Sequence, residues 1–106
     1  MSTEQEQSEA KQLASELLKS NDDYLEKILR LTYLGNVIHG QCWDTEFHVF
    51  GVITSDTDHL PLKKVRRYCS DEFLVKSNIE TESVILFYKA DVVLACNQII
   101  EKYGNV

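Results

Sequence analysis

The sequence has little proline and glycine. Pro61 is the single proline, and there are four glycines among 106 residues, which leaves little material for flexible linkers. A chain of this length has room for one hydrophobic core. We therefore expect one globular domain over residues 1–106. The first two turns of any amino-terminal helix would lack an apolar face, so we expect residues 1–10 to fray.

Cysteine is also scarce, and long apolar runs are missing. Cys42, Cys69 and Cys96 are an odd number at wide spacing, which fits neither a disulfide framework nor a Cys-x-x-Cys metal site. Reduced and mostly buried thiols are the expectation. No run approaches the roughly 18 apolar residues of a membrane span, and the amino terminus is polar and acidic, unlike a secretion signal. These features predict a cytoplasmic protein with no membrane partner.

Basic residues are outnumbered, with a net charge of −6. This argues against nucleic acid as a partner, because phosphate binding needs a basic field. Residues 1–26 hold seven acidic residues and two lysines, a balance of −5. The acidic residues are Glu4, Glu6, Glu9, Glu16, Asp22, Asp23 and Glu26. Such a field speeds association with basic partners, although a solvated helix surface has the same composition.

Good helix formers dominate the amino-terminal part of the chain. They predict a helix over about residues 2–18 and a second, more amphipathic helix over about residues 22–40. Ser20 has a capping-box spacing to Asp23 and is the expected start of the second helix. Gly35 indicates either a close packing contact or a bend, and Gly40 is the expected end.

The middle of the chain reads as two strands. Residues 47–54 (FHVFGVIT) are aromatic and β-branched, which favours a covered strand. The turn Ser55–His59 follows. Residues 60–68 (LPLKKVRRY) fit an edge strand because Pro61 cannot donate a ladder hydrogen bond, while a helical turn fits the same apolar spacing. If this segment is an edge strand, its four basic residues, Lys63, Lys64, Arg66 and Arg67, would protect the edge from pairing with another strand. The alternatives are that they bind an anionic partner or pair with the acidic first helix.

The end of the chain is helical in pattern. We expect a short helix or a turn over residues 70–77, and a long helix from the Ser77-x-x-Glu80 capping box to Tyr103. The long helix is apolar on two sides, which indicates cover by other elements on both. The fold class is therefore predicted as α+β: two amino-terminal helices, a central antiparallel strand pair and a long carboxy-terminal helix packed on it.

Enzyme and metal readings rest on a few side chains near the strand pair. A small metal-dependent enzyme or metal-binding module would use His48, Asp56, Asp58 and His59, with His39 and Cys42 as further candidates. A Cys–His nucleophile pair would combine Cys42 or Cys69 with His48 or His59. Turn formation by the two aspartates and ordinary buried thiols explain the same residues more simply. We predict no catalytic residue, metal or cofactor.

The acidic opening from Glu4 to Glu26, in a small chain with the turn SDTDH, resembles the small acidic immunity proteins of bacterial contact-dependent inhibition and polymorphic-toxin systems. The resemblance implies a cytosolic inhibitor that binds a basic, nuclease-like toxin domain tightly. Exposed aromatic residues would anchor such a partner. The partner-binding residues predicted on this basis are Asp22, Asp23, Glu26, Asp56, Asp58, His59, Trp43 and Tyr68. An oligomerisation or adaptor domain is the further alternative, which the two-sided last helix would permit.

Overall fold

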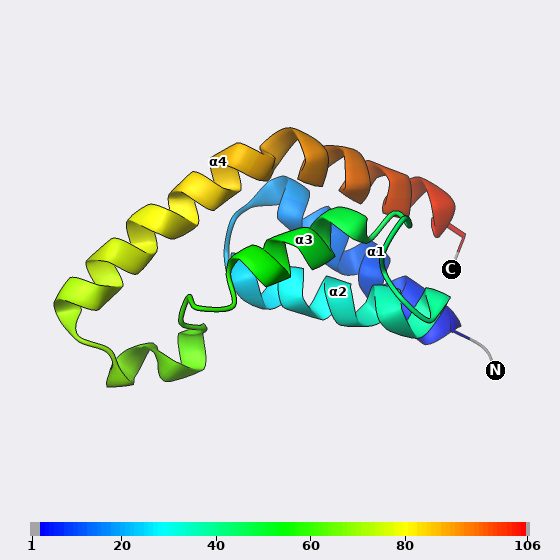
Figure 1. Ribbon diagram of the computed structural model, residues 1–106. Helices are drawn as coiled ribbons and strands as arrows, with labels where there is room; N and C mark the ends of the chain where they lie inside the picture. The colour runs from blue at the N-terminus through cyan, green and yellow to red at the C-terminus, as the bar shows by residue number, and fades with distance from the viewer. Residues whose placement is uncertain (1–2, 106) are drawn as a thin grey trace.

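The fold consists of helices and their connections. The computed structural model describes residues 3–105, and its elements in chain order are α1 (Glu4–Lys19), α2 (Tyr24–His39), α3 (His48–Asp56), the 3₁₀ helix η1 (Lys63–Tyr68) and α4 (Asp71–Lys102) (Figure 1). No strand occurs in residues 3–105. The predicted α+β fold with a central strand pair is therefore wrong.

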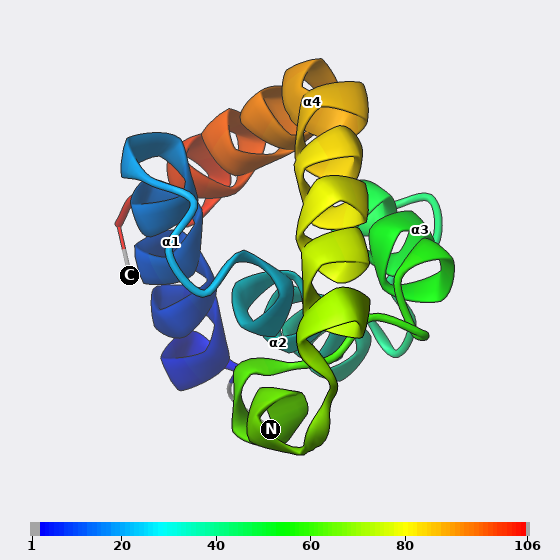
Figure 2. The same cartoon turned by 90° about the vertical axis from the view of Figure 1, so that its left-hand side faces the viewer.

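The four α-helices surround one core. α1 packs on α2 and α4, and α3 also packs on α2 and α4. Figure 2 shows α1 and α3 on opposite sides of α2, with the second half of α4 across the top and its first half reaching down to η1. The largest fully buried side chains come from α2, α3, α4 and the α2–α3 connection: Phe47, Phe50, Ile28, Leu31, Leu34, Ile53, Ile99, Cys42 and Cys96.

The segment predicted as the first strand forms α3. Phe47, Phe50, Ile53 and Thr57 are buried, and their spacing of three and four residues places them on one helical face. Gly35 and Gly51 permit this packing: a Cβ on Gly35 would lie 2.6 Å from Phe47 Cβ, and one on Gly51 would lie 2.8 Å from Cys42 Sγ. The β-forming composition is overridden because a helix buries these aromatic residues against α2.

The segment predicted as the edge strand contains η1, so the helical alternative is the correct one. Leu62 and Cys69 flank it in extended conformation, and the Cys69 N–H bonds to the Arg66 carbonyl at 3.0 Å. Because the segment belongs to no sheet, edge protection no longer explains its charges.

The first two helices agree with the prediction, with shifted ends. α1 begins at Glu4 and buries Ala10, Ala14 and Leu17, so regular helix extends into the stretch expected to fray. α2 is preceded by Asp23, whose φ of 51° is left-handed and whose side chain makes no cap hydrogen bond; the predicted cap at Ser20 is wrong. Gly40, with a φ of 84°, ends α2 as predicted.

The last helix is continuous from Asp71 to Lys102, so the predicted restart at Ser77 is wrong. Ser70 caps it by accepting a hydrogen bond from the Phe73 N–H at 3.1 Å. Thr81 and Ser83 hydroxyls donate to the carbonyls of Ser77 and Ile79 at 2.8 and 3.1 Å, a contact that bends helices. Figure 1 shows α4 as an arch whose convex side faces away from the other helices.

One end of the molecule projects. The extents are 45 × 27 × 22 Å and the radius of gyration is 14.1 Å, above the roughly 13 Å of a compact chain of this length. The projecting part holds η1 and the first half of α4 (Figure 1). The first half of α4 is consequently covered less than the second half, which contains Val92, Ala95, Cys96 and Ile99, all buried.

Candidate functional site

The outer face of α4 is the most unusual surface of the described chain. Leu86 and Phe87 are 72% and 78% exposed, and Ile79 and Leu94 are 61% and 59% exposed. We define the outer face by the following exposed, uncharged residues: Ile79, Ser83, Leu86, Phe87, Ala90, Val93, Leu94 and Asn97. They lie opposite Val92, Cys96 and Ile99, which are buried against the other helices. The two-sided pattern of this helix was predicted correctly, but the predicted cover on both sides is wrong.

Length and apolarity would also allow α4 to cross a membrane. Within residues 3–105 it is the one helix that meets both conditions, and 22% of its most apolar stretch is buried. The expectation of a cytoplasmic protein with no membrane partner stays a prediction. Core helices of soluble proteins meet the same conditions, so α4 is weak support for a membrane segment.

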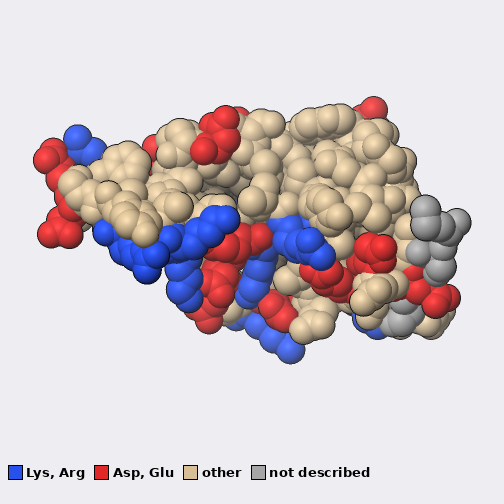
Figure 3. Space-filling view, turned by 90° about the horizontal axis from the view of Figure 1, so that it is seen from below, with Lys and Arg blue, Asp and Glu red and all other residues tan. Residues whose placement is uncertain are grey.

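The acidic residues predicted at the start of α2 face the basic run of η1. Lys63 Nζ lies 3.5 Å from Asp23 Oδ1, and the Lys63 N–H donates to Glu26 Oε2 at 2.7 Å. Figure 3 shows the blue cluster of η1 beside red acidic side chains. Asp22 is exposed and has no ion pair in the described part of the chain. The surface around Asp22 is thus mixed in charge rather than purely acidic.

Of the residues predicted in a contact turn, Asp56 is the last residue of α3, and Asp58 and His59 lie in the turn that follows it. Asp56 accepts a hydrogen bond from the Tyr88 hydroxyl, and the interaction with Asp56 raises the pKa of Tyr88. His59 bonds to Glu80 and lies 3.8 Å from Asp58. Two of the three predicted contact residues are therefore engaged in contacts that hold α4 in place.

The two predicted aromatic anchors lie apart from each other. Trp43 is 44% exposed and packs edge-on against the His48 ring at 5.3 Å. Tyr68 is 74% exposed, with the Arg67 guanidinium carbon 4.8 Å from its ring centroid. Both are open to solvent in part, as an anchor requires, but they stand on different segments and form no joint patch.

The residues proposed for an enzyme or metal site do not converge. No group of three or more His, Cys, Asp or Glu side chains in residues 3–105 could hold a metal ion. His48 Nδ1 accepts the Asp44 N–H at 3.0 Å, while Asp56 and His59 bond to separate residues of α4. Burial raises the pKa of the Cys42 thiol, which opposes formation of a thiolate nucleophile. Cys42 and Cys96 are buried and Cys69 is half-buried, all with free thiols.

A cluster that sequence reasoning missed surrounds Glu46. Its carboxylate lies 2.6 Å from His39 Nε2 and accepts bonds from the Tyr103 hydroxyl at 2.8 Å and Lys102 Nζ at 3.1 Å. Burial would raise the pKa of Glu46, but these hydrogen bonds outweigh it and lower the pKa to about 2. Burial and the bond to Glu46 raise the pKa of Tyr103. The cluster joins the end of α2 to the end of α4 and has a structural role.

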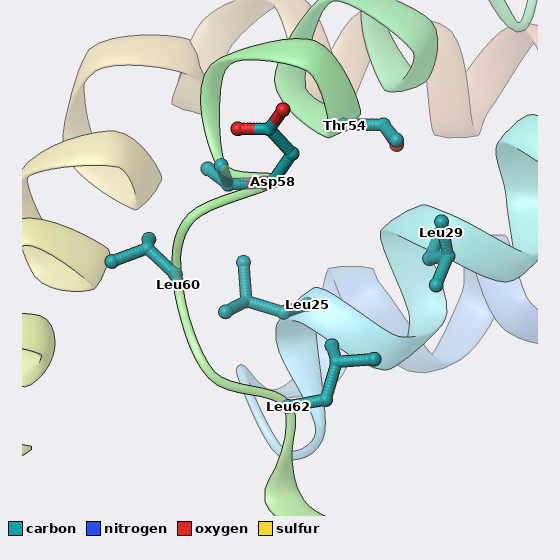
Figure 4. Close-up of a pocket in the computed structure, with 7 residues that line it drawn as sticks. Leu25, Leu29, Thr54, Asp58, Leu60 and Leu62 are labelled. Atoms are coloured by element: carbon teal, nitrogen blue, oxygen red, sulfur yellow. The ribbon is translucent and has the colours of Figure 1, made fainter. Parts of the chain in front are cut away.

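A small apolar hollow lies between α2, α3 and the connection to η1. Its volume is about 210 Å³ and its lining includes Leu25, Leu29, Leu60 and Leu62, with Asp58 at the rim (Figure 4). Pockets for small molecules are usually about 300–1,000 Å³. The hollow is too small for such a ligand and would accommodate at most a single side chain of a partner.

Comparison of the chain with protein-family models, with curated proteins and with solved structures finds no match. The functional proposals therefore depend on the surfaces of this chain.

Proposed function

We propose that this protein acts by protein–protein association through the outer face of α4, and not as an enzyme. The observation that supports the proposal is the row of exposed apolar side chains centred on Leu86 and Phe87. Exposed apolar residues that are contiguous mark interaction sites in soluble proteins, whereas scattered ones do not. This corresponds to the oligomerisation or adaptor alternative of the sequence analysis.

Photo-crosslinking from the outer face tests the proposal. A photoreactive residue replaces Phe87 in the full chain, in the cells that produce the protein, and the matched control carries it at Asn36, which is exposed on α2. We expect protein adducts from position 87 and few from position 36. Adding Leu86→Gln to the position-87 variant should remove the adducts.

Folding must be unchanged for this comparison to hold. Because Phe87 and Leu86 are largely exposed, both variants should keep the melting temperature of the wild type to within a few degrees, as is usual for surface substitutions. If position 87 gives no more protein adduct than position 36 in folded protein, the outer face is not an association surface.

We propose, as a second candidate, a cytosolic immunity protein that binds a basic toxin domain. The supporting observations are the net charge of −6 and the exposure of Asp22 and Asp58. Since the Lys63 ammonium lies beside Asp23 and the Lys63 N–H donates to Glu26, Asp22 is the most available of these three acidic residues to a partner.

Charge reversal at Asp22, Asp23 and Glu26 tests this second candidate. Each change to Lys should slow association with a basic toxin domain, Asp22→Lys most strongly, and the effect should shrink as salt rises because exposed charges are screened. Association rates in stopped-flow mixing provide the measurement. Equal rates for wild type and variants across a salt series would contradict the proposal.

A further inference from the structure

We infer that the partner of the outer face is a second copy of this chain, docked antiparallel through α4 so that Glu82 of each copy lies beside Lys89 of the other. The inference rests on the proposed function and names its partner.

The spacing of the outer face is that of a helix-pairing seam. Ile79, Ser83, Leu86, Ala90, Val93 and Asn97 follow one another in alternating steps of four and three residues. This is the average repeat of 3.5 residues that keeps one stripe of a helix facing a partner helix over several turns. None of the six carries a charge, and all six are exposed.

The sizes of these side chains favour an antiparallel pair. Small residues (Ser83, Ala90) alternate with large ones (Leu86, Ile79). In an antiparallel pair with its two-fold axis between residues 84 and 85, Ser83 meets Leu86 of the second copy and Ala90 meets Ile79. Large and small residues then interlock. A parallel pair would put each residue opposite itself, so the small residues would leave gaps.

The charges beside the seam agree with the same register. Glu82 and Lys89 flank the seam on one side, both are exposed, and neither forms an ion pair within the described chain. In the antiparallel register each Glu82 lies beside Lys89 of the second copy, which makes two symmetric pairs of opposite charge. Flanking pairs of this kind set orientation in helix pairs. In a parallel register Glu82 would instead lie beside Phe87.

The shape of α4 leaves this contact open. The convex side of the α4 arch faces away from α1, α2 and α3 (Figure 1), and Leu86 and Phe87 of this helix are 72% and 78% exposed. A membrane surface suits the face less well, because apolar helices that lie on bilayers carry basic residues beside the apolar band. Here the residues beside the apolar band of α4 are mainly acidic: Glu80, Glu82 and Asp91, against the single basic residue Lys89.

Analytical ultracentrifugation of the full chain tests the inference. Over a concentration series from about 1 μM to about 1 mM, the range of weak to moderate association, we expect a monomer–dimer equilibrium. Leu86→Gln should raise the dissociation constant at least about tenfold, since it removes an apolar side chain near the centre of the seam from both copies, where large effects cluster. A wild type that stays monomeric throughout would overturn the inference, and co-sedimentation of that monomer with anionic lipid vesicles would assign the face to a membrane.

A charge swap tests the register. Glu82→Lys or Lys89→Glu alone should raise the dissociation constant about fivefold, because each change affects two exposed pairs worth about 0.5 kcal/mol each. The double variant E82K/K89E should restore the wild-type value. Asp22→Lys and Lys64→Glu make the same charge changes outside α4, at exposed positions, and should have no effect. Failure of the double variant to rescue would exclude the antiparallel register.

Failure of this inference is distinguishable from failure of the proposed function. A monomeric protein that still forms heterologous adducts from position 87 would keep the association function and exclude the second copy as partner. If the protein forms neither adducts from position 87 nor dimers, both the association function and the second copy as partner are excluded.

Discussion

The inner and outer faces of α4 are both apolar but have opposite environments. Cys96 and Ile99 on the inner face are fully buried, whereas Leu86 and Phe87 on the outer face are more than two-thirds exposed. α1 and α3 cover the first face and leave most of the second exposed. An apolar helix face therefore predicts that something packs against it, but the pattern does not say whether the same chain or a partner does so.

Matched truncations on the two faces should produce the largest difference. Ile99→Ala removes a fully buried side chain and should lower the free energy of unfolding by about 2–5 kcal/mol. Leu86→Ala removes the same number of carbon atoms from the outer face and should change it by less than about 0.5 kcal/mol. Urea unfolding at low protein concentration, where association is negligible, measures both. Comparable losses would mean that the outer face is part of the monomer core.

The Glu46 cluster at the inner end of α4 should have the next largest effect. Glu46→Gln removes an ionised acceptor of bonds from Tyr103 and Lys102 and should cost about 1.5–3 kcal/mol, the worth of hydrogen bonds to a charged group. Urea unfolding at neutral pH is the measurement.

The same cluster predicts a dependence on pH. The pKa of Glu46 is lowered from 4.5 to about 2 in the fold, so its stabilisation is complete above the unfolded value and is lost as pH falls from about 5 towards 2. The wild type should therefore lose more stability over this window than Glu46→Gln does. Parallel pH curves for the two proteins would show that Glu46 has no such role.

The cap at the projecting end of α4 should have the smallest effect on global stability. Ser70→Ala removes the bond to the Phe73 N–H and should cost the first turns of α4 about 1 kcal/mol. Because this half of the helix has little cover, hydrogen exchange should speed up near residues 71–76 while the second half, around Ile99, keeps its protection. Uniform acceleration along α4 would show that the helix opens as one unit.

Sequence reasoning failed where composition and packing disagree. Residues 47–54 have β-forming residues, yet Phe47, Phe50 and Ile53 also share a helical spacing. The close approach that favours the helix brings Gly35 against Phe47 and Gly51 against Cys42, which are not neighbours in the chain. Ser77 and Glu80 have the spacing of a capping box, but Ser77 is buried within a continuous helix and Glu80 bonds to His59.

The candidate site was predictable in part. The two apolar faces of the last helix could be predicted from periodicity alone. Which of the two faces stays exposed to solvent could not. Of the predicted contact residues, Asp23, Glu26, Asp56 and His59 have partners within the chain. Such pairings join residues more than twenty positions apart, which a single sequence cannot reveal.

The sequence by itself determined the positions of α1 and α2, the end of α2 at Gly40, and the two apolar faces of α4, because these depend on periodicity and on the conformational freedom of glycine. Tertiary structure alone decided that residues 48–56 are helical and that α4 is one helix. It also decided which face of α4 is covered, since α1 and α3 can pack on only one side of it. The apolar face that they leave exposed is the surface on which both functional proposals for α4 depend.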